Sequence, residues 1–353
     1  MKPQACVFLI VMTSLVLVAC GAPATPAPAA TPTSLPEIPF TPSAVVSLNE
    51  RLVAAVNIDE HPLATETMIG NHPDEIVIAQ DSIWTRTANG HVVQVDPTSN
   101  EMVAAVKADT TSDLDHYCHG LGTDGDDIWS CSAADDGDNR AIHVVRIDPE
   151  SQSVVETVAV GKIFEQFELP YLANRIWVLT GSGEQLVGID VTTNQPEPGI
   201  DLGTRCFQLA AAENSLFAAC TWDNLVLRID PETGEVAQRV TIESPRNIAA
   251  ANNGIWVTQN NAVVRLDPDS LAPVARFTGL AGVGTNGDIF SSEDAVWVRV
   301  ENGFLYRIDP ASNQIVEQVT PEDELTGGSV VATTDSVWTT AIDDNLLIRL
   351  NLQ

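Results

Sequence analysis

Two short segments with the polarity pattern of β-strands make up the chain between residues 253 and 268. An apolar pair, Ile255-Trp256, precedes a polar turn, and an alternating segment then runs through Val264-Arg265-Leu266 to Asp267-Pro268. Asp accepts backbone hydrogen bonds in a turn, and Pro removes a donor from the strand ladder, so this pair ends the second strand. The pattern predicts two antiparallel strands joined by a polar turn.

The same pattern recurs in degenerate form six more times. Alignment on its aromatic residue gives seven anchors: Trp84, Trp129, Trp177, Phe217, Trp256, Trp297 and Trp338. Successive anchors lie 39 to 48 residues apart. A repeat of about 40–45 residues with short strands is typical of propellers, in which no blade can bury its faces alone. The sequence predicts an all-β fold: a seven-bladed β-propeller with four-stranded blades.

The ends of the chain predict how this ring closes. The chain stops at Gln353, directly after the third strand of the seventh blade, so that blade lacks an outer strand. The segment 52–56 closely repeats 102–106, the outer strand of the first blade. We expect the N-terminal strand to complete the last blade, because closure leaves no open sheet edge there.

The N-terminal segment has the features of an export signal. Lys2 precedes an apolar run over residues 5–18, and the run ends in Leu-Val-Ala-Cys-Gly, which resembles the lipobox of bacterial lipoproteins. The resemblance implies a signal peptide over 1–19 and a lipidated Cys20; an ordinary secretory signal is the alternative. Residues 20–44 are rich in Pro, Ala and Thr and predict an extended tether before a propeller over 45–353. The expected location is extracytoplasmic, with the lipid as the only membrane contact.

The net charge limits the classes of partner that the protein is expected to bind. Acidic residues outnumber basic ones by 48 to 17, for a net charge of −31. This charge repels phosphate backbones and anionic headgroups, so nucleic acid is not expected as a partner. We expect an acidic, solvated and monomeric protein.

Four cysteines lie within the repeats: Cys118, Cys131, Cys206 and Cys220. Each pair brackets its anchor in nearly the same way, which places the two members on adjacent strands of one blade. Three connectivities are possible, and the spacing favours two within-blade disulfides, Cys118–Cys131 and Cys206–Cys220. A metal site near His116 and His119 is the alternative.

The repeat, with its Ile-Trp-Val and Arg-Ile-Asp-Pro segments, resembles YVTN-type seven-bladed propellers and, more loosely, streptogramin-lyase-like propellers, over residues 45–353. The lyase resemblance implies His, Glu and magnesium in the later blades. The last histidine here is His143, in the second blade, so those residues do not carry over.

One face of the ring collects the candidate binding residues. In a propeller, the loops that join successive blades share a face with the loops between the second and third strands of each blade. We call this face the mouth. The candidates on it are His72, Tyr117, His119, Phe167, Arg205, Phe207, Trp222, Arg246, Asn286 and Arg299. Packing between blades is the alternative role for the aromatic residues.

Three further patterns of polar or charged residues could have a binding or structural role. A mostly polar position, nine residues before each anchor, predicts a channel lining that either binds a cation or is hydrated: Glu75, Gly120, Glu168, Gln208, Asn247, Asp288 and Ser329. Two long acidic inserts in the second blade, residues 107–115 and 132–140, predict contact with a cationic partner or a divalent ion, with a solvated surface as the alternative; the second insert carries the candidates for Ca²⁺ or Mg²⁺, Asp135, Asp136 and Asp138. The arginines before each Asp-Pro predict either a local ion pair with that Asp or a brace of its turn.

No G-x-S-x-G, H-E-x-x-H or phosphate-binding glycine loop occurs. The sequence therefore favours a non-enzymatic binding platform for a protein, peptide or glycan, with no required cofactor. A metal-dependent lyase or hydrolase of the streptogramin-lyase-like type, with Ca²⁺ or Mg²⁺, is the alternative.

Overall fold

The computed structural model describes residues 35–59, 72–109, 119–133, 142–163, 166–280, 282–283, 287–301 and 304–352. The chain divides into two units, Met1–Ser34 and Leu35–Gln353, and all described residues belong to the second. The predicted signal peptide and Cys20 lie outside the described residues. Among the described residues, no helix is long and apolar enough to cross a membrane.

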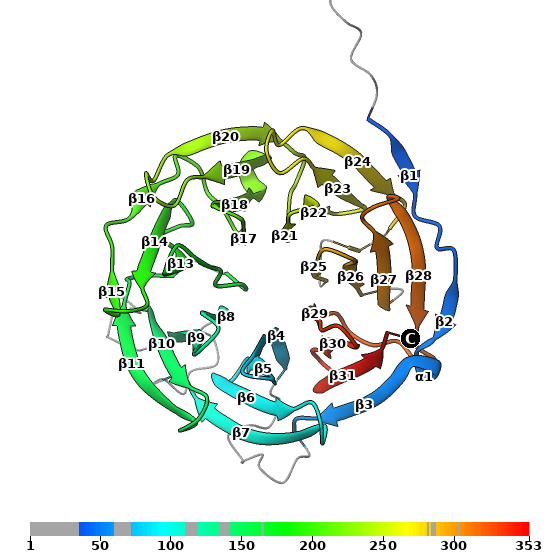
Figure 1. Ribbon diagram of the computed structural model, residues 1–353, viewed down its shortest axis with the longest axis horizontal. Coiled ribbons are helices and arrows are strands. Elements are labelled where there is room, and N and C mark those ends of the chain that lie inside the picture. Colours follow the sequence, from blue (N-terminus) through cyan, green and yellow to red (C-terminus); the bar gives the residue numbers. More distant parts are fainter. Residues whose placement is uncertain are drawn as a thin grey trace, which may run out of the picture. The chain divides into compact units, whose positions relative to one another are not determined.

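The second unit is a ring of seven antiparallel blades, as predicted (Figure 1). Blades one to three contain β4 (Pro73–Ala79), β5 (Ser82–Thr87), β6 (His91–Asp96) and β7 (Glu101–Lys107); β8 (Leu121–Thr123), β9 (Ile128–Ala133), β10 (Ile142–Asp148) and β11 (Ser153–Ala159); and β12 (Tyr171–Leu172), β13 (Arg175–Thr180), β14 (Gln185–Asp190), β15 (Gln195–Pro196) and β16 (Ile200–Asp201). Blades four and five contain β17 (Gln208–Ala212), β18 (Ser215–Cys220), β19 (Leu225–Ile229) and β20 (Val236–Thr241); and β21 (Ile248–Ala251), β22 (Gly254–Gln259), β23 (Ala262–Leu266) and β24 (Pro273–Thr278). Blades six and seven contain β25 (Ile289–Ser291), β26 (Val296–Val300), β27 (Phe304–Asp309) and β28 (Gln314–Thr320); and β29 (Val330–Ala332), β30 (Ser336–Ala341), β31 (Leu346–Asn351) and β3 (Leu52–Asn57).

The hydrophobic core lies between the blades. The second strand of a blade is covered on both faces, so β5, β18, β22 and β30 are buried along their whole length. Outer strands such as β7 and β28 instead alternate between buried and less buried positions, as expected where one face meets solvent. The anchors fill the interfaces: Trp256 packs with Val296 and Val298 of the next blade.

Four of the five arginines of the third strands bind the turn of the neighbouring blade, and none of these four makes the predicted ion pair with the Asp that follows it. The guanidinium of Arg265 lies over the Trp256 ring at 5.1 Å and donates to the carbonyl oxygen of Pro310 and to Asn313 Oδ1, both at 2.6 Å. Pro310 and Asn313 belong to the turn of the next blade. Arg146, Arg228 and Arg349 reach the next blade in the same way.

The aspartates of the Asp-Pro pattern have the predicted role in their turns. Asp230 Oδ1 accepts from the backbone N–H groups of Glu232 and Thr233 at 2.8 and 3.1 Å, and Asp148 Oδ1 accepts from Glu150 N at 2.8 Å. These backbone N–H donors hold the pKa of both carboxyls below the ordinary range. The aspartates therefore fix the turn, while the arginines two residues earlier fix the neighbouring blade.

The ring closes as the sequence predicts. β3 pairs antiparallel with β31, so that blade seven takes its fourth strand from the start of the chain (Figure 1). The short helix α1 (Leu48–Arg51) leads into β3, and Ser47 caps it by accepting from Asn49 N. Leu48 packs beside Leu305 and Val337, which attaches the helix to the core between blades six and seven.

The segment before α1 differs from the predicted tether. β1 (Glu37–Pro39) pairs in parallel with β24, and β2 (Val45–Ser47) pairs in parallel with β28, along the outside of blades five and six (Figure 1). Phe40 packs edge-on against Tyr306, with the ring centroids 4.8 Å apart. The structured unit begins at residue 35 rather than at 45, because two outer edges offer unpaired backbone groups. We call residues 36–47 the N-terminal strap.

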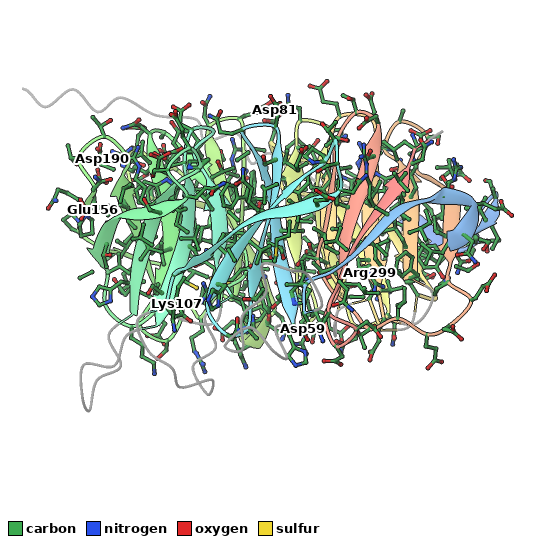
Figure 2. The ribbon with its side chains drawn as sticks, turned by 90° about the horizontal axis from the view of Figure 1, so that it is seen from below. Asp59, Asp81, Lys107, Glu156, Asp190 and Arg299 are labelled. Carbon is green, nitrogen blue, oxygen red and sulfur yellow. A yellow bond between two sulfur atoms is a disulfide. The ribbon has the colours of Figure 1, made fainter. Side chains whose placement is uncertain are left out.

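The two faces of the ring carry different loops. Asp81 and Asp190 lie at one face, whereas Asp59 and Lys107 lie at the opposite face (Figure 2). Lys107 ends an outer strand, so the second face holds the connections between blades. This face is the mouth, and the predicted binding residues are located relative to it below.

Candidate functional site at the mouth and channel

A row of aromatic side chains crosses the mouth of blades two, three and four. His119 precedes β8, Phe167 precedes β12 and Phe207 precedes β17, so each comes from the loop that enters a blade. Trp222 lies in η2 (Thr221–Asp223), the turn between β18 and β19. All four were predicted from the sequence as mouth residues. We call these four side chains the aromatic row.

Successive members of the row contact one another across blade boundaries. The ring of His119 stacks on Phe167, with centroids 4.8 Å apart. Phe167 meets Phe207 edge-on at 5.7 Å, and Phe207 meets Trp222 edge-on at 6.1 Å. These are favourable geometries for aromatic pairs. The structure thus joins residues that lie about 100 positions apart in the sequence into one surface.

Polar groups hold both ends of the row. His119 Nδ1 lies 2.5 Å from Asp74 Oδ2, a buried carboxylate of blade one. At the other end, the guanidinium of Arg205 lies 4.6 Å from the centre of the Trp222 ring, an arrangement that favours a cation over an aromatic face. Trp222 is 49% exposed, although large aromatic residues are usually mostly buried.

A disulfide lies directly beneath the Trp222 end. Cys206 and Cys220 are bonded, as predicted, and they immediately precede Phe207 and Thr221. Cys131 is also disulfide-bonded. Its predicted partner Cys118 lies outside the described residues. The Cys206–Cys220 bond cross-links the two loops that carry Phe207 and Trp222, which limits how far these rings can separate.

The aromatic row adjoins a cavity in the channel. The cavity has a volume of about 290 Å³, and Phe167 belongs both to its wall and to the row. Its polar wall is the predicted series: Glu75, Glu168, Gln208, Asn247 and Asp288. Ile248, Ile289 and Val330 supply apolar wall next to these groups.

Hydrogen bonds along this polar series connect only part of the ring. Asn247 Nδ2 donates to the carbonyl oxygen of Gly287, linking blades five and six. Asp288 Oδ2 accepts from Val330 N at 3.2 Å, and Ser329 Oγ donates to Glu75 Oε2 at 3.2 Å, which continues the series through blade seven to blade one.

Blades three and four are different. Gln208 is 5% exposed, and its buried Oε1 has no hydrogen-bond partner among the described residues. The Glu168 carboxylate has no hydrogen-bond or ion-pair partner in the described part of the chain either. The unpaired oxygens therefore lie on the same two blades as Phe167, Phe207 and Trp222.

The channel carboxylates all have raised pKa values. Burial, followed by the charge of Asp288, raises the pKa of Glu168 to about 8. Burial raises the pKa of Asp288 to about 7, and burial together with Asp288, Glu168 and Asp74 raises the pKa of Glu75 well above 4.5. Glu168 is nevertheless exposed by surface area, because it faces the open channel while protein surrounds it on all sides.

Two other predicted mouth residues lie at the mouth but outside the row. His72 Nδ1 lies 3.2 Å from Asp343 Oδ1 at the boundary of blades seven and one. Arg246 lies at the entry of blade five, and its buried Nε has no hydrogen-bond partner among the described residues.

Arg299 is fully buried. It donates to the carbonyl oxygens of Phe304, Val300 and Thr326 and to Thr339 Oγ1. Burial lowers its pKa to about 9. Arg299 therefore connects blades six and seven rather than reaching the surface. Figure 2 places it within the ring, toward the mouth side.

The remaining candidates lie outside the described residues: Tyr117, Asn286, Asp135, Asp136 and Asp138. Within the described segments, no group of three His, Cys, Asp or Glu side chains is arranged to hold one metal ion. The carboxylates of the channel are thus spread around its wall and do not converge on one point.

The sequence predicted Glu75, Glu168 and Asp288 as a channel lining that either binds a cation or is hydrated, apart from the binding residues of the mouth, and it missed Asp74. The available signal was the polar residue nine positions before each anchor. Asp74 lies one position earlier in a single blade, so no repeat pointed to it.

Comparisons with known proteins support the fold. No family model matches the chain, and no curated protein matches it. Among solved structures, the Pan2 WD40 domain of Neurospora crassa superposes with a TM-score of 0.67 and 12% identity, over 87% of this chain and 98% of that one. A catalytically inactive virginiamycin B lyase from Staphylococcus aureus, in a structure with quinupristin, gives a TM-score of 0.62 and 15% identity, over 85% and 99%.

A third structure, hydrazine synthase of Kuenenia stuttgartiensis, gives a TM-score of 0.64 and 12% identity, over 83% of this chain and 98% of that one. The three structures are a WD40 domain, a lyase and a hydrazine synthase, and identities this low show the fold alone. The chain is a seven-bladed β-propeller.

Proposed function

We propose that this propeller is a non-enzymatic binding protein that captures a peptide segment, free or within a protein, on the aromatic row at its mouth. The observation that carries the proposal is the continuous contact of His119, Phe167, Phe207 and the half-exposed Trp222 across three blades. Exposed, pre-positioned aromatic side chains are the residues that most often dominate the energetics of protein recognition.

Rigidity supports the same proposal. The Cys206–Cys220 disulfide cross-links the Phe207 and Trp222 loops. Asp223 accepts from Thr204 Oγ1, and Thr221 Oγ1 donates to Pro245 O at 2.6 Å, so η2 is held from two sides. A surface that is ordered before binding loses less conformational entropy when a ligand arrives.

The proposal includes the cellular setting expected from the N-terminal sequence. The mature protein begins at a lipidated Cys20 and is held outside the cell membrane as a monomer, with the mouth available to partners. The Cys206–Cys220 disulfide supports an oxidising location. Metabolic labelling with an alkyne fatty acid tests the anchor, because a Cys20→Ala variant should lose the label.

A random peptide library displayed on phage tests the binding function. We expect the wild-type protein to enrich a peptide motif, and the Trp222→Ala variant to bind the enriched peptides at least 10-fold more weakly. Tyr171→Ala is the matched control, because Tyr171 is 40% exposed in blade three but lies outside the row.

A glycan array, run in parallel, distinguishes the other binding class. Glycan binding that depends on Trp222 without any peptide enrichment would replace the peptide proposal. Turnover of a streptogramin-type cyclic depsipeptide with added Mg²⁺ would instead support the lyase alternative. Enriched peptides that bind Trp222→Ala as tightly as wild type would contradict the role of the row.

A further inference from the structure

One part of the channel wall contains hydrogen-bond acceptors to which no described group donates. The Glu168 carboxylate and Gln208 Oε1 have no hydrogen-bond donor among the described residues, although Gln208 is only 5% exposed. A buried carbonyl oxygen without a donor is destabilising, so such groups are uncommon unless a ligand or water donates to them. The two oxygens border the same 290 Å³ cavity, together with Glu75 and Asp288.

The negative charge of this wall favours a positively charged ligand. The charged groups that face the cavity are Glu75 of β4, together with Glu168 and Asp288 in the segments that enter blades three and six, and Asp74 lies beside Glu75. Asp74 already has a partner in His119. The pKa of Glu168 is raised only by burial and by another carboxylate, without an offsetting cation. An added positive charge would therefore relieve both the burial cost and the mutual repulsion.

The shape of the site specifies the kind of cation. The described part of the chain contains no three acidic or histidine side chains that converge on one metal ion. The cavity is also far larger than a bare ion, since a water molecule occupies only about 30 Å³ of liquid volume. Its apolar wall of Ile248, Ile289 and Val330, with the Phe167 ring at the mouth side, suits an alkyl body. Both features fit an organic cation that has several N–H donors.

We propose that the channel binds a primary alkylammonium group, which donates hydrogen bonds to Glu168 and Gln208 Oε1 while its alkyl chain lies against Phe167 and the apolar wall. An ammonium group has three donors and no acceptor, which matches a wall that presents only unpaired acceptors. The site shares Phe167 with the peptide surface proposed above but needs neither Trp222 nor Arg205.

Titration of the intact propeller with n-butylammonium chloride tests this site, by calorimetry and thermal shift at pH 8.5 and constant ionic strength. We expect saturable binding and a rise in melting temperature. 1-Butanol, which keeps the alkyl chain but not the charge, should give neither. Binding should weaken from pH 8.5 to pH 6, because protonation of Glu168 and Asp288 removes the negative charge while butylammonium stays charged.

Three variants localise the site. Glu168→Gln should weaken butylammonium binding at least 10-fold, whereas Gln208→Glu should strengthen it at least 3-fold by adding a carboxylate. Glu156→Gln, on an exposed outer strand, is the matched control and should bind like wild type. Trp222→Ala should also bind butylammonium normally, so failure of peptide binding and failure of this site can be told apart.

The inference is overturned if sodium chloride gives the same thermal shift as butylammonium chloride, or if Glu168→Gln retains wild-type affinity in a folded protein. Saturable binding of Ca²⁺ that depends on Glu168, without binding of butylammonium, would assign the channel to an inorganic cation and likewise refute it.

Discussion

At the scale of single residues, Arg265 contributes more than a surface ion pair would. Its side chain is partly buried, covers Trp256 and binds the turn of the next blade through two acceptors. We expect Arg265→Ala to lower the free energy of unfolding by about 1–3 kcal/mol, since charge-assisted hydrogen bonds and the contact with the ring are lost together. Chemical denaturation monitored by tryptophan fluorescence measures this change.

Arg265→Lys is the matched control. Lysine keeps the charge but cannot reproduce the planar fork that reaches Pro310 and Asn313, so it should recover less than half of the loss. If Arg265→Ala lowers the free energy of unfolding by less than about 0.5 kcal/mol, Arg265 contributes no more than an exposed ion pair does.

Glu168 should make stability depend on pH. Its pKa rises from an ordinary 4.5 to about 8 on folding. Its contribution to the free energy of unfolding is therefore fully present below pH 4.5 and is lost as the pH rises through 8. In the absence of amine, Glu168→Gln should therefore match wild type near pH 5 and melt at a higher temperature near pH 8.5. Melting curves across this range measure the difference.

Asp230 provides the opposite control. Backbone N–H donors lower its pKa below 3.8 on folding, so its contribution is present above pH 3.8 and is lost as the pH falls through the folded value. Asp230→Asn should melt below wild type at neutral pH and approach it in acid. If the melting-temperature differences of the two variants from wild type change with pH in the same direction, the pKa of Glu168 is not raised on folding.

At the scale of elements, the N-terminal strap is part of the folded unit. β1 and β2 extend two blades by parallel pairing, and Phe40 packs on Tyr306 and Phe277. We expect a chain that starts at Ser43 to lose on the order of 2–4 kcal/mol of stability, because it loses the Phe40 contacts and the whole of β1. A chain that starts at Leu35 should unfold like the full-length protein. Equal denaturation midpoints for the two chains would show that β1 and Phe40 contribute nothing to stability.

The elements also show which features a sequence pattern can predict. Trp256 and its equivalents marked the second strands because each occupies the same environment in its own blade. The pairing of β3 was predicted from a local repetition, 52–56 against 102–106. The strap was missed because its pairing depends on two strand edges about 240 to 270 residues away, and its own Pro-containing sequence has no strand period. The partner of Arg265 was missed for a related reason, since it lies on another blade.

The candidate site was predictable in the same limited sense. Loop position alone placed Phe167, Phe207 and Trp222 at the mouth. Their contacts, and the exclusion of Arg299 from the surface, depend on how neighbouring blades pack. A pattern within one repeat carries no information about such distances.

At the scale of the whole molecule, closure by β3 should govern global stability. Deleting residues 52–58 removes one strand of blade seven and the buried Val56 and Ile58. We expect a destabilisation beyond the ~4 kcal/mol that bounds most point substitutions, together with a less cooperative transition. Calorimetry of the deleted protein measures both.

A synthetic peptide covering residues 45–58 supplies the control for this deletion. Added in excess, it should restore much of the melting temperature, because it can pair with β31 and replace the missing strand. A deleted protein that melts like wild type without the peptide would contradict the importance of closure.

The same pairing has a consequence for how the chain reaches its native state. β3 precedes every blade in the sequence, yet its partner β31 follows almost 300 residues later. Blades one to six can form from local hairpins, whereas β3 must wait for a contact that spans nearly the whole ring. Such long-range contacts form slowly, and an unpaired strand invites aggregation until they do. The folding propeller should thus need protection by a chaperone until β31 is available to pair with β3.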